Sequence, residues 1–205
     1  MMLVEQTTVP GAAMPVAQFK DHLRLGTGFA DDGVQDQLLE TFLRAAMAAI
    51  EASTGKILLS RDFTWTLTAW RDLAAQALPV APVSQITSLT ITDRLGGDEL
   101  ISTDRYTLEA DLHRPRLVST GICLPAIPVG GQVGIAFEAG FGPNWSDIPS
   151  DLAQAVMLLA ATYYENRADS GAGAGAIGQA QLPAMVNALI GRYRTVRLFG
   201  GGGGA

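Results

Sequence analysis

Cysteine and histidine are almost absent from this sequence. Its 205 residues include one cysteine, Cys123, and two histidines, His22 and His113. A single thiol rules out an intrachain disulfide and a thiolate metal cluster. Ile122 and Leu124 flank the cysteine, so we expect an apolar setting that keeps the thiol unreactive. We therefore predict that Cys123 is a small buried hydrophobic residue in a reducing compartment.

Long apolar runs are also missing. The longest stretch, 155–161, falls far short of the ~18 uninterrupted apolar residues that a membrane span needs. The first twenty residues lack a basic segment followed by an apolar one, so no secretory signal is predicted. We expect a protein that is made in the cytoplasm and has no membrane partner.

Positive charge is scarce. Fourteen basic residues stand against twenty acidic ones, for a formal net charge of −6. Proteins that hold nucleic acid over their whole surface neutralise phosphates with Lys and Arg, so the composition argues against that class. Hydrophobic residues make up 48% of the chain, which is enough to build a real core.

Hydrophobic periodicity predicts helices at both ends of the chain and strands between them. Helical spacing of apolar residues, with Asp31 or Asp32 as an N-cap and Gly55 just past the end, indicates a long helix over 32–54. Further helices are predicted over 15–25, 150–167 and 182–194. Alternating patterns predict strands at 63–70, 86–92, 106–112, 116–118 and 133–139, with a hairpin turn at 93–98.

These patterns predict an α+β fold in which a helical frame carries an inserted β-rich module. The frame comprises residues 15–57 and 143–199, and the module comprises residues 58–142. An N-terminal arm (1–14), a Gly/Ala linker (168–181) and a glycine tail (200–205) complete the chain.

Residues with catalytic or metal-binding chemistry are few. Glu109, Asp111 and His113 alternate, so on a strand they would share one face and form a possible metal site. A solvated strand face is favoured instead, because no second histidine or acidic cluster is placed to complete the coordination shell. The glycines at 173–178 spell G-x-G-x-x-G, but they follow a predicted helix and not a strand. We predict no catalytic residue, metal site or cofactor.

The C-terminus carries a small basic and aromatic cluster. Arg192, Arg194 and Arg197 are interleaved with Tyr193 and Phe199. Three interpretations are open: contact with DNA phosphates, docking onto a protein partner, and cations placed against a helix dipole. The second and third are about equally favoured, and DNA contact comes behind both.

Several segments in sequence order carry a resemblance to a known family. They are QFKDHLRL (18–25), LLETFLRAAMAAIEASTGKILL (38–59), FTWTLTAW (63–70), LPVAPVSQITSLTITD (78–93), VGIAFEAGFGPNWSDIPSDLAQAVMLLAATYYENR (133–167) and LPAMVNALIGRYRTVRL (182–198). Together they cover most of 15–199. The chain is similar to the head–tail connector (head-completion adaptor) family of long-tailed double-stranded DNA phages and related gene transfer agents.

The resemblance implies a non-enzymatic adaptor in the neck of a virion or phage-like particle, assembled in the bacterial cytoplasm. It implies a ring of twelve identical subunits below the portal protein, in contact with a stopper or tail component. Double-stranded DNA would pass through the channel without sequence-specific binding, and an acidic lumen would let it leave. Two other classes stay open: another neck component, such as a stopper or tail terminator, and a small enzyme with an unrecognised site.

Two sets of residues are candidates for assembly contacts. The helix over 150–167 is apolar around most of its circumference, which favours burial against a neighbouring subunit as well as in its own fold. Its subunit-packing candidates are Met157, Leu158 and Tyr164. The portal-docking candidates form the C-terminal cluster, namely Arg192, Tyr193, Arg194, Arg197, Leu198 and Phe199.

Overall fold

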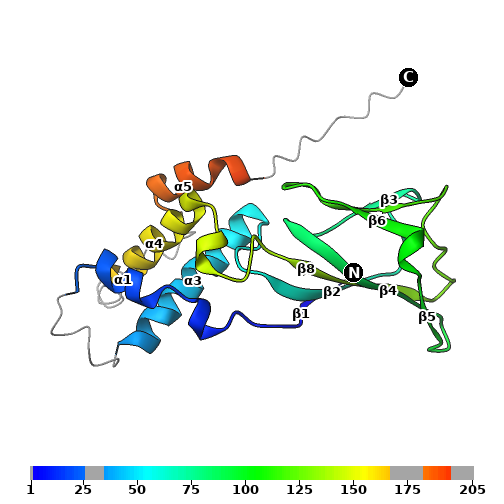
Figure 1. The fold of residues 1–205 in the computed structure, drawn as a ribbon, viewed down its shortest axis with the longest axis horizontal. Helices are drawn as coiled ribbons and strands as arrows, with labels where there is room; N and C mark the ends of the chain where they lie inside the picture. Colours follow the sequence, from blue (N-terminus) through cyan, green and yellow to red (C-terminus); the bar gives the residue numbers. More distant parts are fainter. Residues whose placement is uncertain (1, 26–34, 167–181, 195–205) are drawn as a thin grey trace, which may run out of the picture.

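The computed structural model describes residues 2–25, 35–166 and 182–194. Helices gather at one end of the molecule and two β-sheets at the other (Figure 1). The α+β class predicted from the sequence is confirmed. The expected N-caps Asp31 and Asp32, the linker 168–181 and the tail 200–205 lie outside the described residues.

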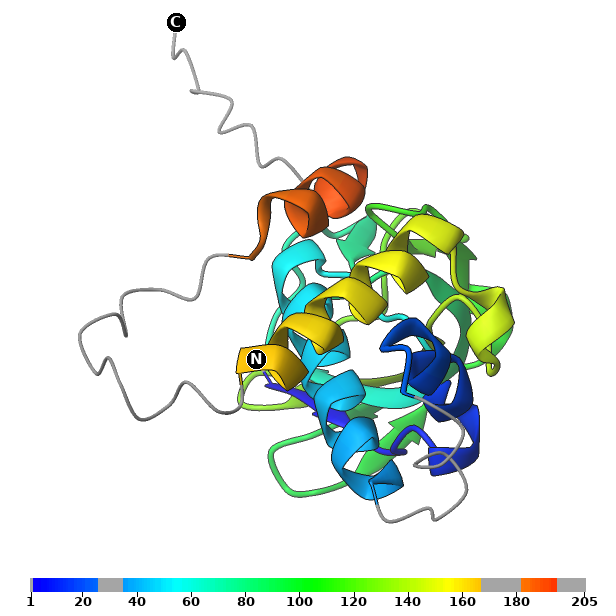
Figure 2. The same ribbon diagram turned by 90° about the vertical axis from the view of Figure 1, so that its left-hand side faces the viewer.

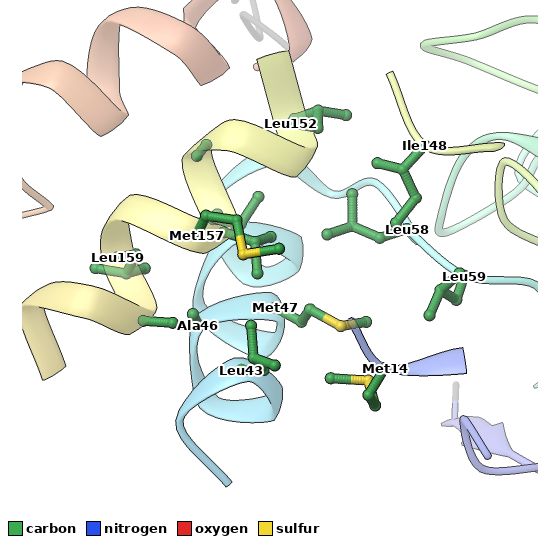
Figure 3. Close-up of a cluster of buried hydrophobic side chains, with 14 of the residues drawn as sticks. Met14, Leu43, Ala46, Met47, Leu58, Leu59, Ile148, Leu152, Met157 and Leu159 are labelled. Carbon is green, nitrogen blue, oxygen red and sulfur yellow. The ribbon is translucent and has the colours of Figure 1, made fainter. Parts of the chain in front are cut away.

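Four α-helices form the helical end: α1 (Val16–His22), α3 (Asp36–Thr54), α4 (Ser150–Glu165) and α5 (Ala184–Ile190). Helix α4 packs along α3, while α5 contacts α4 and α1 contacts α3 (Figure 2). Segments from the two ends of the sequence therefore share one hydrophobic core, which includes side chains from both α3 and α4 (Figure 3).

Helix α3 shows how the sequence pattern produces this packing. Its buried side chains recur every three or four residues, which places them on one face of the helix. They are Leu39, Leu43, Ala46, Met47, Ile50 and Thr54. The helix ends at Gly55, whose φ of 68° is the left-handed conformation predicted for this glycine.

A five-stranded antiparallel sheet forms the centre of the β-rich end, in the order β1-β2-β8-β4-β5. Its strands are β1 (Met2–Glu5), β2 (Arg61–Leu67), β8 (Gln132–Ala139), β4 (Val83–Thr92) and β5 (Asp98–Leu100). A second antiparallel sheet has the order β3-β7-β6, with β3 (Ala75–Ala77), β7 (Arg116–Ser119) and β6 (Tyr106–Glu109).

Alternation along the strands creates a second core between these sheets. In β2, Phe63, Trp65 and Leu67 are buried, while the intervening threonines are half-exposed. These side chains cluster with Leu117 of β7 and Tyr106 of β6. The side chains of the two sheets therefore form one cluster, and the helical core is a separate one.

The turn after β8 demands glycine. Gly140 has a φ of 139°, and a Cβ at this position would lie 2.5 Å from the backbone of Ser60. Position 140 can therefore be occupied only by glycine, because any side chain would clash with the backbone just before β2.

Several sequence predictions need correction. The strand expected over 63–70 ends at Leu67, and the one expected over 106–112 ends at Glu109. The predicted burial of Cys123 is wrong: the residue is exposed, in a loop after β7 where Ser119 Oγ donates to its carbonyl oxygen at 2.7 Å. Its neighbour Ile122 is 96% exposed, whereas Leu124 on the other side is buried, so apolar neighbours in the sequence did not bury the cysteine. No helix among the described residues has the length and the apolar character that crossing a membrane requires.

Candidate assembly surfaces

The C-terminal cluster packs against the start of α4. Tyr193, in the 3₁₀ turn η5 (Gly191–Tyr193), is buried, and its hydroxyl donates to Asp151 Oδ1 at 2.8 Å. Arg192 Nη2 lies 2.8 Å from Asp151 Oδ2, and its guanidinium stacks 4.8 Å from the Tyr193 ring centroid. Burial raises the pKa of Tyr193, and the hydrogen bond from Arg192 opposes this rise. The aromatic ring belongs to the core of its own chain.

The other portal-docking candidates are placed differently. Arg194 Nη2 donates to Asn187 Oδ1 of α5 at 2.7 Å. Arg197, Leu198 and Phe199 lie outside the described residues. Arg192 keeps most of its side chain exposed despite its ion pair, so it can still contact a partner.

The subunit-packing candidates on α4 differ in their burial. Met157 is buried in the helical core of its own chain (Figure 3). Leu158 and Tyr164 are half-buried, and the Tyr164 ring stands edge-on to Phe42 of α3 at 6.0 Å. Met185 of α5, which the sequence analysis did not single out, is 65% exposed. The helical end therefore shows partly exposed apolar side chains on more than one helix.

An ion-pair network joins the helical end to the sheet. Arg61, the first residue of β2, bonds Glu51 of α3 through Nη2 at 2.6 Å and Glu5 of β1 through Nη1 at 3.0 Å. Glu51 Oε1 also accepts the backbone N–H of Leu58 at 2.8 Å. Only 10% of the Arg61 side chain is exposed. Sequence reasoning missed this network, because the three charges are far apart in the chain and follow no period.

The possible metal site does not form a shared strand face. Strand β6 ends at Glu109, which pairs with Arg116 at 2.7 Å. Asp111 instead accepts the backbone N–H groups of His113 and Arg114, which lowers its pKa. Within residues 2–25, 35–166 and 182–194, no group of three or more His, Cys, Asp or Glu is placed to hold a metal ion.

Apolar side chains are also exposed on the β-rich end. Three of the four residues of β1 are apolar and exposed, namely Met2, Leu3 and Val4. Leu100 of the opposite edge strand β5 is 71% exposed. Both outer strands of the five-stranded sheet therefore present apolar side chains to solvent.

This chain is similar to proteins of known structure. No protein-family model and no curated protein matches the chain. A chain in the neck of an empty gene transfer agent particle, computed with C6 symmetry, is 54% identical, with a TM-score of 0.86. A chain in the virion of a native gene transfer agent particle is 53% identical, with a TM-score of 0.84. A chain in the neck of a native particle, computed with C12 symmetry, is 48% identical, with a TM-score of 0.82.

Each of these matches covers 98% of this chain and 99% of the other chain. Similarity at this level over the whole length includes the helical end and both sheets. The chain belongs to the family of structural proteins found in the neck of gene transfer agent particles.

Proposed function

We propose that this protein is the adaptor of the neck: a ring of twelve identical subunits below the portal that joins capsid to tail. The observation that carries the proposal is the full-length similarity to neck proteins, one of them in a neck computed with C12 symmetry. The role is mechanical, with no catalysis and no cofactor, and the ring is part of the virion.

The helical end supports a ring of identical subunits. Leu158, Tyr164 and Met185 are partly or largely exposed apolar side chains on α4 and α5. Apolar surface of this kind is typical of a face that a partner covers. In a ring with cyclic symmetry, each copy would bury such a face against a different face of the next copy.

The C-terminal residues are the proposed contact with the portal. Tyr193 and Arg192 are engaged with Asp151, so the docking role falls mainly on Arg197, Leu198 and Phe199, with the exposed part of Arg192 beside them. Arginine and aromatic residues are frequent anchors in protein interfaces. The stopper or tail component would then bind elsewhere on the ring.

The channel is proposed to pass double-stranded DNA without binding its sequence. The net charge of −6 supports this, because like charges repel and an acidic lumen does not retain DNA. Reversing the charge of channel-facing acidic residues should slow DNA release from particles. Unchanged release would argue against the acidic lumen.

The test is light scattering on the purified chain, alone and mixed with the portal protein of its own particle. We expect a ring-sized assembly in at least the mixture. A chain that ignores the portal but assembles with the tail protein would instead be a stopper or tail terminator. A monomer indifferent to both would contradict a neck role and would direct a screen for bound small molecules.

A further inference from the structure

The five-stranded sheet has two open edges in the described part of the chain. Strand β1 forms one edge and pairs only with β2, while β5 forms the other and pairs only with β4. All residues of both strands are exposed. A sheet with two different open edges can continue from one copy into the next.

The hydrogen-bond pattern shows which backbone groups face outward. The N–H of Gln6 bonds Asp62 of β2, so in an antiparallel ladder residues 2 and 4 also face β2, and Leu3 and Glu5 face away. At the other edge, the N–H of Ile101 bonds Leu89 of β4. Residue 99 therefore faces β4 as well, and residues 98 and 100 face away. Each edge offers the N–H and C=O groups of two alternate residues.

The β1 edge lacks the usual protection against pairing. Natural edge strands carry charges, prolines or bulges that discourage association. Here Met2, Leu3 and Val4 carry no charge, and the carboxylate of Glu5 is held by Arg61. Such an edge is suited to main-chain pairing with a second strand.

The direction of the strands limits how two copies can join. Four successive antiparallel pairings give β1 and β5 of one chain the same sense within the sheet. Rotation by one-twelfth of a turn about a ring axis does not reverse that sense. Strand β5 of one copy would therefore meet β1 of the next copy as a parallel pair.

We propose that β1 of each subunit pairs in parallel with β5 of its neighbour, so that the sheets of the ring form one continuous band. The proposal rests on the ring inferred above. In a parallel pair, the N–H and C=O of one residue bond the two residues on either side of the residue opposite it. With Leu3 opposite Glu99 of the next subunit, the N–H and C=O of Leu3 bond residues 98 and 100. These are the residues whose backbone groups face outward on the β5 edge.

The sheet faces agree with this register. Leu3 lies opposite Trp65 and Glu99 opposite Ile91, and both of these partners are buried on the face between the sheets. The next pair, Val4 with the neighbour's Leu100, joins side chains on the other face. A slip by one residue would place side chains of opposite faces together.

Sheet dimensions are compatible with a closed ring. Five strands about 4.8 Å apart give about 24 Å per copy, so twelve copies enclose a radius of about 46 Å. Met2 is level with Gly134 of β8 through Thr66, and Leu100 is level with Gly134 through Thr90. From this common level, β1 and β5 extend in opposite directions. In the proposed register Leu3 and the neighbour's Glu99 each lie one residue from this level, in opposite directions. The resulting offset of about 7 Å requires strands tilted by about 16° to the ring axis, as tilt compensates stagger in barrels.

Proline tests the main-chain contact directly. The N–H of Leu3 faces outward, so Leu3→Pro should keep the β1–β2 ladder but remove a donor from the outer edge. We expect at least about a tenfold rise in the concentration for half assembly, measured by light scattering, with thermal unfolding of the monomer little changed. Leu3→Ala, which keeps the N–H, is the matched control and should assemble nearly normally. Leu100→Pro should reproduce the defect from the other edge.

Disulfide trapping tests the register independently. In a Cys123→Ser background, Leu3→Cys with Glu99→Cys, and Val4→Cys with Leu100→Cys, should each give an oxidised ladder extending to the full ring. Each single cysteine variant should give no ladder. If the wild-type chain forms rings but neither pair crosslinks and Leu3→Pro assembles normally, the edge pairing is wrong while the adaptor ring stands. If the wild-type chain never forms a ring, even with the portal, both proposals fail.

Discussion

Arg61 Nη2 donates a hydrogen bond to Glu51 Oε1 across 2.6 Å and so ties the long helix α3 to the first residue of strand β2. The same guanidinium holds Glu5 of β1, so one side chain connects the helical end, the central sheet and its edge strand. The network therefore links α3, which contributes to the helical core, with β2, which contributes to the core between the sheets.

Glu51→Ala is expected to destabilise the fold. It removes one of the two carboxylates that bond Arg61, whose side chain is 10% exposed, and it removes the acceptor of the Leu58 N–H. We expect a loss of about 2–4 kcal/mol in the free energy of unfolding, measured with urea. The matched control is Glu109→Ala, which breaks the exposed pair with Arg116 and should cost much less, because water screens exposed ion pairs. Equal losses for the two variants would refute a special role for the network.

Two C-terminal truncations should separate docking from folding. Removal of 195–205 leaves Tyr193 in place against Asp151, so we expect normal stability with lost portal binding. Removal of 192–205 also deletes the buried ring and should lower the free energy of unfolding by about 3 kcal/mol or more. Thermal unfolding and portal co-sedimentation measure the two effects. Normal portal binding by the shorter truncation would show that docking lies elsewhere.

Lys56 should make the free energy of unfolding depend on pH in the alkaline range. Its side chain is almost fully buried, and burial lowers its pKa, with the charge of Asp111 opposing the shift. The unfolded chain therefore holds this proton to higher pH, so stability rises as pH increases from the folded pKa towards ~10.4. Below the folded pKa, the cost of the buried charge is constant.

Lys56→Met should remove that dependence. We expect the variant to be the more stable protein at pH 7, with the difference from wild type shrinking as the pH approaches ~10. Urea unfolding across this pH range measures the difference, and the other titrating groups cancel in the comparison. A constant difference between the two proteins would mean that Lys56 does not titrate differently in the folded state.

Cys123 should react in the native protein. It is exposed in the loop after β7, contrary to the expectation from its apolar neighbours in the sequence. We expect one thiol per chain to be modified by a disulfide reagent without denaturant, at a rate close to that in urea. Cys123→Ser should show no modification and unchanged stability. Protection of the thiol in the folded chain would contradict the described loop.

Local pattern was enough to predict most helices and strands. Helix α3 and its capping Gly55 follow from apolar spacing and from the freedom of glycine at positive φ. The hairpin between β4 and β5 follows from alternation around a glycine turn, in which Gly96 has a φ of 85°. These features depend on residues close in the chain, so the sequence could specify them before any tertiary contact formed.

Tertiary structure decided which of these elements meet, and with that the environment of the candidate residues. Residues 2–5 of the predicted N-terminal arm form strand β1 because their backbone pairs with β2, about sixty residues away. Tyr193, one of the portal-docking candidates, is buried in the core of its own chain, and its hydroxyl donates to Asp151 at the start of α4. The sequence by itself determined the class of fold and most of its helices and strands. Burial, charge pairing and open sheet edges depend on long-range contacts, which no local period encodes.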